Sequence, residues 1–242
     1  MTDLEQRTAE WHRARVGKLT ASNLGALLGQ VSYVSRATAY KRALGLDEFV
    51  GNCATQWGTV NECNGLHSYH TLTGNLIQPT GLHTHSQYEW LAGSPDGLIG
   101  NEGMIEVKCP YYFRKDGTGR LHKEIPLHYL QQVNALLEIT GRTWCDYVCW
   151  APEGMVVYRV HSDPDLFRFL LHHYSRINAA MRAGLPKPPF LSTNDKLEIT
   201  KRLTESRDRT VNYSFWTNID QRDQIPKVDI LDEDEHYFSN DC

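Results

Sequence analysis

The sequence lacks any run of about 18 or more apolar residues, so we expect no transmembrane helix. Residues 1–15 are polar and charged, which predicts no secretory signal peptide. The cysteines show neither the paired spacing of a zinc ribbon nor the grouping that an iron–sulfur cluster needs; they are Cys53, Cys63, Cys109, Cys145, Cys149 and Cys242. Free thiols in a reducing cytoplasm, away from membranes, are the expectation.

The chain also lacks a basic excess, since 25 Lys and Arg face 29 Asp and Glu, a net charge of −4. Six of those acids lie in residues 229–242, which contain no Lys or Arg, so the remainder carries 23 acids and a net charge of +2. Any surface that binds nucleic-acid phosphates would therefore be local. The acidic C-terminal tail is typical of a solvated, disordered end.

The apolar periodicity and the turn residues predict an α/β fold with a mixed central sheet flanked by helices. Helices are predicted at residues 20–28, 35–44, 54–72, 126–140 and 163–183. Strands are predicted at 76–79, 82–92, 97–99, 104–109, 144–151 and 155–160, with a loop at 111–124. Three prolines in 185–189 predict the end of a domain at 1–185. Residues 186–242 would form a C-terminal extension with a candidate helix at 194–209 and the acidic tail.

Three charged residues stand out in the predicted strands: Asp96, Glu106 and Lys108. Ile105 and Val107 alternate with Glu106 and Lys108, so the charged pair would share one face of a strand. Asp96 begins the preceding strand, and the residues between the two strands are typical of a turn. A hairpin at this point would place Asp96 beside Glu106.

Adjacent carboxylates repel one another, and a divalent cation with oxygen preference relieves that repulsion. Such a cation lowers the pKa of a bound water and neutralises charge that develops on a phosphodiester. Lys108 could then orient the attacking hydroxide or bind a phosphate oxygen. The three residues therefore predict metal-assisted phosphodiester hydrolysis. The alternative is structural: Asp-Gly is a common turn, and Glu-x-Lys is often a solvated face with a weak ion pair.

Two histidine pairs offer a second kind of metal site. His67 and His70 are three residues apart on a predicted helix, and His83 and His85 alternate on a predicted strand. Neither pair has an obvious third ligand, and eleven histidines make chance pairs common. An accidental arrangement is the favoured interpretation.

Four sequence blocks, in order, carry a resemblance to a known family. They are WHRARVGKLTAS at 11–22, WGTVNE at 57–62, SPDG at 94–97 with IEVKCP at 105–110, and YLQQV at 129–133. With them the chain resembles the lambda-exonuclease-like (viral recombinase) family of PD-(D/E)xK nucleases, over about residues 10–151. The resemblance implies a restriction-endonuclease-like core, and every motif position is occupied by the expected residue type.

The resemblance also implies roles for the charged residues. Asp96 and Glu106 would be metal ligands together with the backbone carbonyl of Val107, and Glu62 would complete the acidic cluster. Lys108 would position or activate the attacking water. The catalytic residues would thus be Glu62, Asp96, Glu106 and Lys108, with Mg²⁺ as cofactor and Mn²⁺ able to substitute.

A second group of residues would, by the same resemblance, bind the phosphate at a DNA 5′ end: Arg15, Ser22, Ser94 and Gln132. Arginine provides bidentate, permanently charged contacts to phosphate. The amides near Ser22 could assist if the start of its helix faces the site. Each residue alone would have an ordinary structural role, as a surface charge, a helix cap or a polar face residue.

The implied function is a Mg²⁺-dependent 5′→3′ exodeoxyribonuclease that digests one strand of duplex DNA and leaves 3′ single-stranded tails for recombination. Double-stranded DNA ends, a ring-shaped homotrimer and a single-strand annealing protein are the implied partners, in a phage or prophage setting within a bacterial cytoplasm. Two alternatives stay open at this point. One is a PD-(D/E)xK endonuclease of restriction or repair type, and the other is a non-catalytic DNA-end-binding protein.

Overall fold

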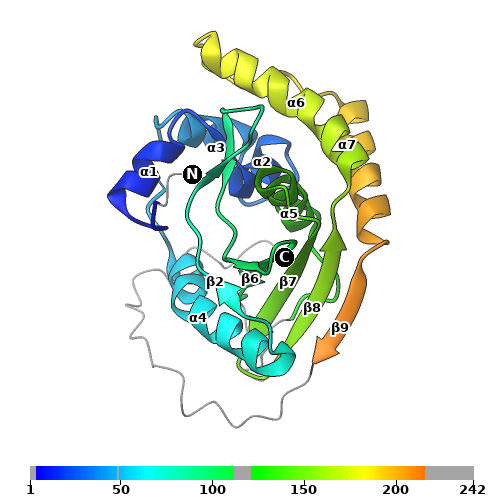
Figure 1. Cartoon of the computed structure of the whole chain (residues 1–242). Helices are drawn as coiled ribbons and strands as arrows, with labels where there is room; N and C mark the ends of the chain where they lie inside the picture. Colours follow the sequence, from blue (N-terminus) through cyan, green and yellow to red (C-terminus); the bar gives the residue numbers. More distant parts are fainter. Residues whose placement is uncertain (1–3, 48, 112–120, 216–242) are drawn as a thin grey trace, which may run out of the picture.

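The large sheet of the computed structural model, which describes residues 4–47, 49–111 and 121–215, organises the whole fold (Figure 1). Its strands run in the order β2 (Ile77–Gln78), β5 (Gly97–Ile99), β6 (Gly103–Lys108), β7 (Trp144–Ala151), β8 (Gly154–His161) and β9 (Val211–Phe215). Only β6 and β7 are parallel neighbours; the other pairs are antiparallel. The mixed sheet flanked by helices confirms the predicted fold class.

Helices cover both faces of this sheet. Parallel neighbours need a crossover connection, and α5 (Leu127–Thr140) lies in the one between β6 and β7. α5 packs on one face with α6 (Pro164–Arg182) and α7 (Thr193–Arg207), around residues such as Met104. α4 (Cys53–Thr73) covers the other face, where Val107 belongs to the second apolar cluster. The middle of β6 is therefore buried on both sides.

The long helices begin and end where the sequence predicts, within two residues. Asn52 caps α4 in a capping box with Thr55, and Gly74 ends that helix with φ 72°. Gly141 ends α5 in the same left-handed conformation, with φ 67°. Asp163 caps α6 through the amide of Leu166, and Pro164 occupies its first turn.

A second, three-stranded sheet has the order β1 (Leu19–Thr20), β4 (Leu91–Gly93) and β3 (His83–Thr84). The predicted single strand at 82–92 is therefore wrong: the segment is a hairpin of two short strands. The turn is held by the His85 ring, which accepts from the Gln87 amide at 3.0 Å. Aromatic and apolar residues around this turn mimic a continuous strand in the sequence.

Three short helices surround the small sheet: α1 (Ala9–Arg15), α2 (Ala21–Leu27) and α3 (Arg36–Ala43). The sequence predicts the second and the third. It does not predict α1, because none of the residues of α1 is buried and the helix has no apolar stripe to display.

The compact body continues past residue 185, where the sequence places its end. α7 coincides with the candidate helix at 194–209, and its Ile199 and Leu203 are fully buried in the core. β9, which the sequence does not predict, pairs with β8. The division into a nuclease domain and an extension stays a prediction. The acidic tail at 229–242 and most of the predicted loop at 111–124 lie outside the described residues. Within the described ranges, no helix is long and apolar enough to span a membrane.

Candidate active site

The β5–β6 hairpin brings Asp96 beside Glu106, as the sequence predicts. Gly97 pairs with Ile105, so the residue before β5 lies across from Glu106. The Asp96 amide donates to the Ile105 carbonyl at 3.1 Å, and the Val107 amide donates to Asp96 Oδ2 at 2.7 Å. These two bonds fix the carboxylate at the end of the hairpin, next to the middle of β6.

Glu106 and Lys108 share the face of β6 that α5 covers. Glu106 is only 2% exposed, and its Oε1 accepts from Lys108 Nζ at 2.5 Å and from Gln132 Nε2 at 2.6 Å. Its other oxygen, Oε2, is buried and has no hydrogen-bond partner among the residues that the structure describes. The alternative of a solvated Glu-x-Lys surface pair is therefore wrong. A buried acceptor with no donor is the kind of group that a cation satisfies.

The two carboxylates destabilise one another's charge. Burial raises the pKa of Asp96, and the neighbouring charges of Glu106 and Glu62 raise it further. Burial also raises the pKa of Glu106, against the opposing influence of Lys108. The site thus carries more negative charge than its single ammonium group compensates.

Lys108 is held in its charged form. Burial alone would lower its pKa, but the negative charges of Glu106 and Asp96 outweigh burial, so the pKa of Lys108 lies above its ordinary value. Its Nζ also lies 4.8 Å from the centroid of the Tyr129 ring. An ammonium fixed between a carboxylate and an aromatic ring is suited to binding an anionic oxygen.

Glu62, on α4, lies near enough for its charge to raise the pKa of both Asp96 and Glu106. Its carboxylate, however, forms an ion pair with Arg7. Among residues 4–47, 49–111 and 121–215, no group of three or more His, Cys, Asp or Glu side chains is arranged to hold a metal ion. Neither histidine pair forms one. Asp96 and Glu106 supply a two-carboxylate oxygen donor set with one unsatisfied oxygen, which fits Mg²⁺.

A second group of polar residues adjoins the carboxylates. Arg15 Nη2 donates to Ser22 Oγ at 3.2 Å and to Thr20 Oγ1 at 3.4 Å. The Arg15 guanidinium lies 3.9 Å from the centroid of the Trp11 ring, whose Nε1 donates to Ser94 Oγ at 2.9 Å. Burial lowers the pKa of Arg15 to about 10, so it remains positive at neutral pH.

Three of the four predicted phosphate-binding residues are therefore linked: Ser22 contacts Arg15 directly, and Ser94 is connected to Arg15 through Trp11. Ser94 follows β4, Ser22 lies in α2 after β1, and these two strands are neighbours in the small sheet. Ser94 is two residues before Asp96, so this group and the carboxylates are joined by one short segment. Gln132 is apart from it, because its amide is bonded to Glu106.

Three residues of this region have no role that is predicted from the sequence: Trp11, Tyr129 and Arg7. Trp11 precedes Arg15 by four residues, a helical spacing at which side chains meet, so that signal is readable. Tyr129 precedes Gln132 by three residues on α5 and can be found by the same rule. Arg7 comes from a non-helical segment, and no local pattern connects it to Glu62.

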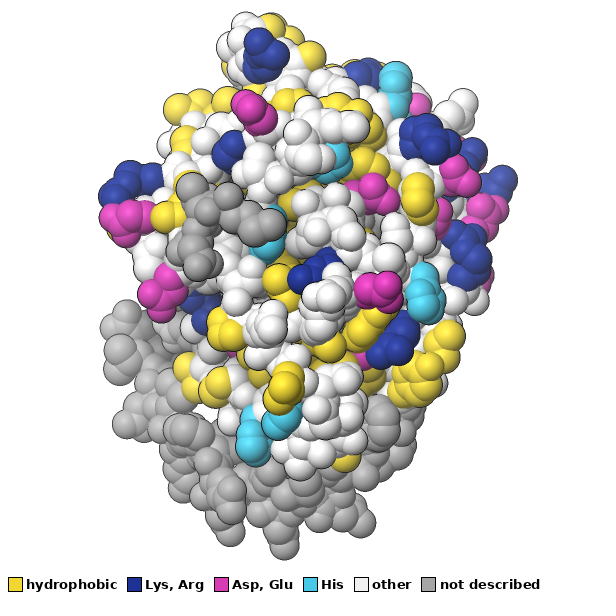
Figure 2. All heavy atoms as spheres, viewed as in Figure 1, with side chains coloured by type: hydrophobic (Ala, Val, Ile, Leu, Met, Phe, Trp, Pro, Cys, Tyr) yellow, Lys and Arg dark blue, Asp and Glu magenta, His cyan; other side chains and the backbone are white. Residues whose placement is uncertain are grey.

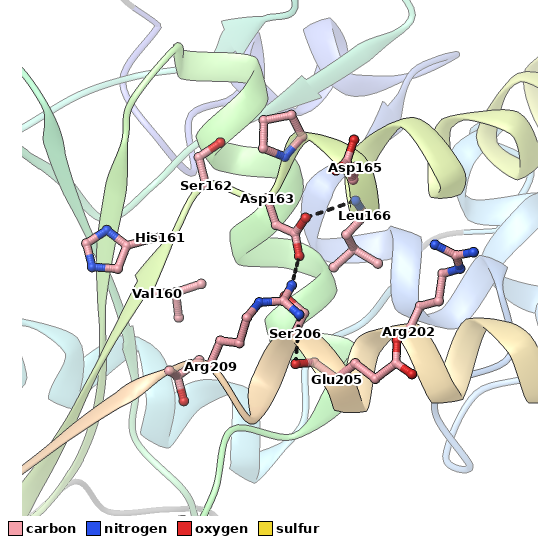
Figure 3. Close-up of a pocket in the computed structure, with 12 residues that line it drawn as sticks. Val160, His161, Ser162, Asp163, Asp165, Leu166, Arg202, Glu205, Ser206 and Arg209 are labelled. Atoms are coloured by element: carbon pink, nitrogen blue, oxygen red, sulfur yellow. Dashed lines mark hydrogen bonds and ion pairs between the residues drawn. The ribbon is translucent and has the colours of Figure 1, made fainter.

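The distribution of basic side chains on the surface fits the prediction that any phosphate-binding surface is local. On the face shown in Figure 2, basic side chains lie in small groups, many of them beside acidic ones, and form no continuous patch. A groove of about 560 Å³ lies elsewhere, between the start of α6 and the end of α7 (Figure 3). Its Arg209 is paired with Asp163. It adjoins His161, which pairs with the start of β7 and thus lies at the end of the sheet opposite Lys108.

Comparison with known proteins places this site in a family context. Residues 10–143, more than half of the chain, match the YqaJ-like viral recombinase domain family. Residues of the chain are also 27% identical, over 158 positions, to the uncharacterized protein R354 of Acanthamoeba polyphaga mimivirus. That match covers 60% of this chain and 29% of the viral protein, so the chain spans less than a third of this relative.

The fold is similar to the crystal structure of an alkaline exonuclease, LHK-Exo, from Laribacter hongkongensis. The TM-score is 0.59 at 24% identity, covering 82% of this chain and 99% of that chain. The crystal structure of LHK-Exo in complex with dAMP gives a TM-score of 0.56 at the same identity and coverage. This likeness confirms the predicted fold, a mixed α/β sheet flanked by helices, as one found in an exonuclease structure.

Proposed function

The chain belongs to the YqaJ-like viral recombinase domain family, and from this premise we propose that it is a metal-dependent deoxyribonuclease. It would digest one strand of duplex DNA in the 5′→3′ direction and leave 3′ single-stranded tails for recombination. The observation that carries the proposal is the meeting of Asp96, Glu106 and Lys108 in one mostly buried site, with Ser94 two residues before Asp96 and linked through Trp11 to Arg15. A similar fold in an alkaline exonuclease crystallised with dAMP supports a deoxynucleotide substrate.

The residues present suit a hydrated divalent cation, Mg²⁺ or Mn²⁺. Asp96 and Glu106 would hold it with the Val107 carbonyl, and Glu62 would complete the set. When bound, such a cation supplies a more acidic water and neutralises charge on the scissile phosphate. This role accounts for the unsatisfied Glu106 oxygen and for the negative charge that Lys108 leaves uncompensated.

The remaining residues would bind and orient the DNA. Lys108, fixed between Glu106 and the Tyr129 ring, would hold the attacking water or a phosphate oxygen in line. Arg15 would bind the terminal 5′ phosphate with the hydroxyls of Ser22 and Ser94. Its burial strengthens that contact, because charges interact more strongly away from water. Gln132 would keep Glu106 oriented and reach the phosphate only by exchanging its present bond.

The catalytic assignment is tested with Asp96→Asn, which preserves size and the acceptor for the Val107 amide. Loss of a partner outside the coordination shell typically costs about 10- to 100-fold in metal affinity or activity, and loss of a ligand should cost more. We expect Mg²⁺-dependent digestion of linear duplex to fall at least about a hundredfold, with DNA binding retained. Undiminished digestion by the purified variant would refute the assignment.

The direction of digestion is tested at the DNA ends. A 5′-phosphorylated end should be digested much faster than a 5′-hydroxyl end, because only the former engages the Arg15 guanidinium. Arg15→Ala should erase that difference while leaving the slow rate on 5′-hydroxyl ends. Equal rates of the wild-type protein on both ends would defeat the polarity proposal.

Two rival functions give different results on other substrates. Closed circular duplex has no end, so an exonuclease leaves it intact and an endonuclease nicks it. A non-catalytic end-binding protein retains DNA without Mg²⁺-dependent loss of substrate. A trimeric ring and an annealing protein partner belong to the same proposal. A mass measurement in solution that gives a monomer, with and without DNA, would remove the ring.

A further inference from the structure

Residues 4–8, which precede α1, are hydrogen-bonded to the loop that carries Asp96. Gln6 Nε2 donates to the carbonyl of Pro95 at 2.9 Å and to that of Thr80 at 3.2 Å. Leu4 lies directly on Gly81, where an added Cβ would come within 2.4 Å of the Leu4 carbonyl oxygen. Glycine is therefore required at residue 81 for this close approach. The segment is anchored at two points beside the candidate active site.

Arg7 lies in this anchored segment, directly after Gln6. With φ 69°, it is the only non-glycine residue with positive φ in the part of the chain that the structure describes. Such a backbone is unfavourable for arginine and persists only where the surroundings hold it. The conformation directs the guanidinium to the carboxylate of Glu62 on α4. The contact joins residues 55 positions apart in the sequence.

Glu62 differs from the other two members of the predicted acidic cluster, because its carboxylate forms an ion pair with Arg7 of the N-terminal segment. Asp96 is bonded to a backbone amide within its hairpin, and Glu106 to Lys108 and Gln132. Glu62 instead faces a permanent cation and is 24% exposed at its side chain. A guanidinium and a hydrated dication need the same carboxylate oxygens, and their positive charges repel at short range.

We propose that Arg7 and the divalent cation compete for Glu62, so that Arg7 is a positioning residue that must release this carboxylate before the acidic cluster is complete. The inference rests on the proposed metal-dependent function. The Arg7 guanidinium keeps Glu62 charge-balanced when no cation is bound. Arg7 thereby lowers affinity for the cation.

Calorimetric titration of Mg²⁺ or Mn²⁺ into the metal-free full chain, without DNA, tests this directly. Arg7→Asn removes the guanidinium, and asparagine tolerates the left-handed backbone. An exposed ion pair contributes little, so we expect the variant to bind the cation about two- to fivefold more tightly. Arg13→Gln is the matched control, because Arg13 pairs with Glu10 within α1 and its removal should leave affinity unchanged.

A double-variant comparison isolates the role of Glu62. In a Glu62→Gln background, Arg7→Asn should no longer change cation affinity, because the contested carboxylate is gone. Unchanged or weaker binding by the single variant Arg7→Asn would overturn the inference while leaving the proposed function intact. No cation binding by the wild-type protein or by Arg7→Asn would overturn the proposed metal dependence, and this inference with it.

Discussion

At the scale of single residues, the site is an imbalance of charge. Two carboxylates lie together in a mostly buried position, one of them paired with the single ammonium, and a third carboxylate lies nearby. Neutralising one of the carboxylates should raise the free energy of unfolding, and neutralising the ammonium should lower it. Two neutralising substitutions, one of each sign, should therefore change the stability of the protein in opposite directions.

Asp96→Asn should stabilise the metal-free protein. The pKa of Asp96 is raised in the fold, so at neutral pH its charged form favours unfolding, and asparagine removes that cost. We therefore expect the free energy of unfolding to be higher for Asp96→Asn than for the wild-type protein. Urea denaturation in the presence of a chelator measures it. A loss of stability would contradict the charge assignment.

Lys108→Met should act in the opposite direction. Methionine retains the length of the side chain but leaves Glu106, 2% exposed, without its ammonium partner. Breaking one partner of a buried pair typically costs about 3–5 kcal/mol. In metal-free urea denaturation we expect a loss on the order of 3 kcal/mol, partly restored by Mg²⁺. Indifference to both substitution and Mg²⁺ would argue that the carboxylates are not charged.

His128 should make stability depend on pH. Burial, with the nearby charges of Lys108 and His122, lowers its pKa from 6.5 to about 4. Between these values the unfolded chain takes up a proton at His128 that the folded protein does not, so the contribution of His128 to stability rises with pH across about 4 to 6.5. His128→Gln should flatten this rise when unfolding free energy is measured from pH 4 to 7. An unaltered slope would show that His128 does not contribute.

Most residues of the candidate site could be predicted from the sequence, but the hydrogen bonds and ion pairs between them could not. Asp96, Glu106 and Lys108 are neighbours through one hairpin, so strand alternation is enough to group them. The Arg7–Glu62 pair depends on where a non-helical segment lies against α4, which no local pattern encodes. Gln132 is expected among the phosphate ligands, but burial of Glu106 under α5 places its amide against that carboxylate.

At the scale of elements, the site depends on how closely α4 packs on β6. Gly65 of α4 lies against Val107, between Glu106 and Lys108: an added Cβ would come within 2.6 Å of Val107 Cγ1. Gly58 in the same helix has nothing within 4 Å of the equivalent point. The two glycines thus share helix propensity and differ in packing.

Gly65→Ala should therefore destabilise the protein and reduce nuclease activity, because either α4 or Val107 must shift. Overpacking typically costs about 1–3 kcal/mol. Gly58→Ala should instead stabilise by up to about 1 kcal/mol through helix propensity, with unchanged activity. Thermal denaturation and digestion rates of both variants check this. Equal effects of the two substitutions would contradict the packing account.

Element prediction succeeds where a clear period and a cap coincide, and it fails where apolar residues cross a turn. The helix at 126–140 has both signals and is observed as α5 with its Gly141 end. The hairpin at 83–93 contains apolar and aromatic residues on both sides of a turn without glycine or proline, so its pattern predicts one strand.

At the scale of the molecule, the segment after residue 185 completes the core. Fully buried Ile199 in α7 packs in the main cluster, whereas Leu197, two positions earlier, is 65% exposed. Ile199→Ala should cost about 2–5 kcal/mol, and Leu197→Ala should stay within about 0.5 kcal/mol. Urea denaturation of the full chain compares them. Similar small losses for both would mean that α7 is dispensable.

This whole-molecule role could not be foreseen from the prolines at 185–189, which are typical of a linker. Only two apolar residues of α7, Ile199 and Leu203, are buried, which gives a weak periodic signal, and β9 is an edge strand among the described residues. The order of blocks along the chain, by contrast, is enough to identify the family.

The central claim, metal-dependent cutting of one strand from a 5′ end, is tested most directly by one digestion time course. Linear duplex with 5′ phosphates is labelled separately at the 5′ and the 3′ end of one strand and incubated with and without Mg²⁺. We predict early release of the 5′ label, late loss of the 3′ label and no reaction without the cation. Release of the 3′ label first, or digestion that ignores Mg²⁺, would contradict the account.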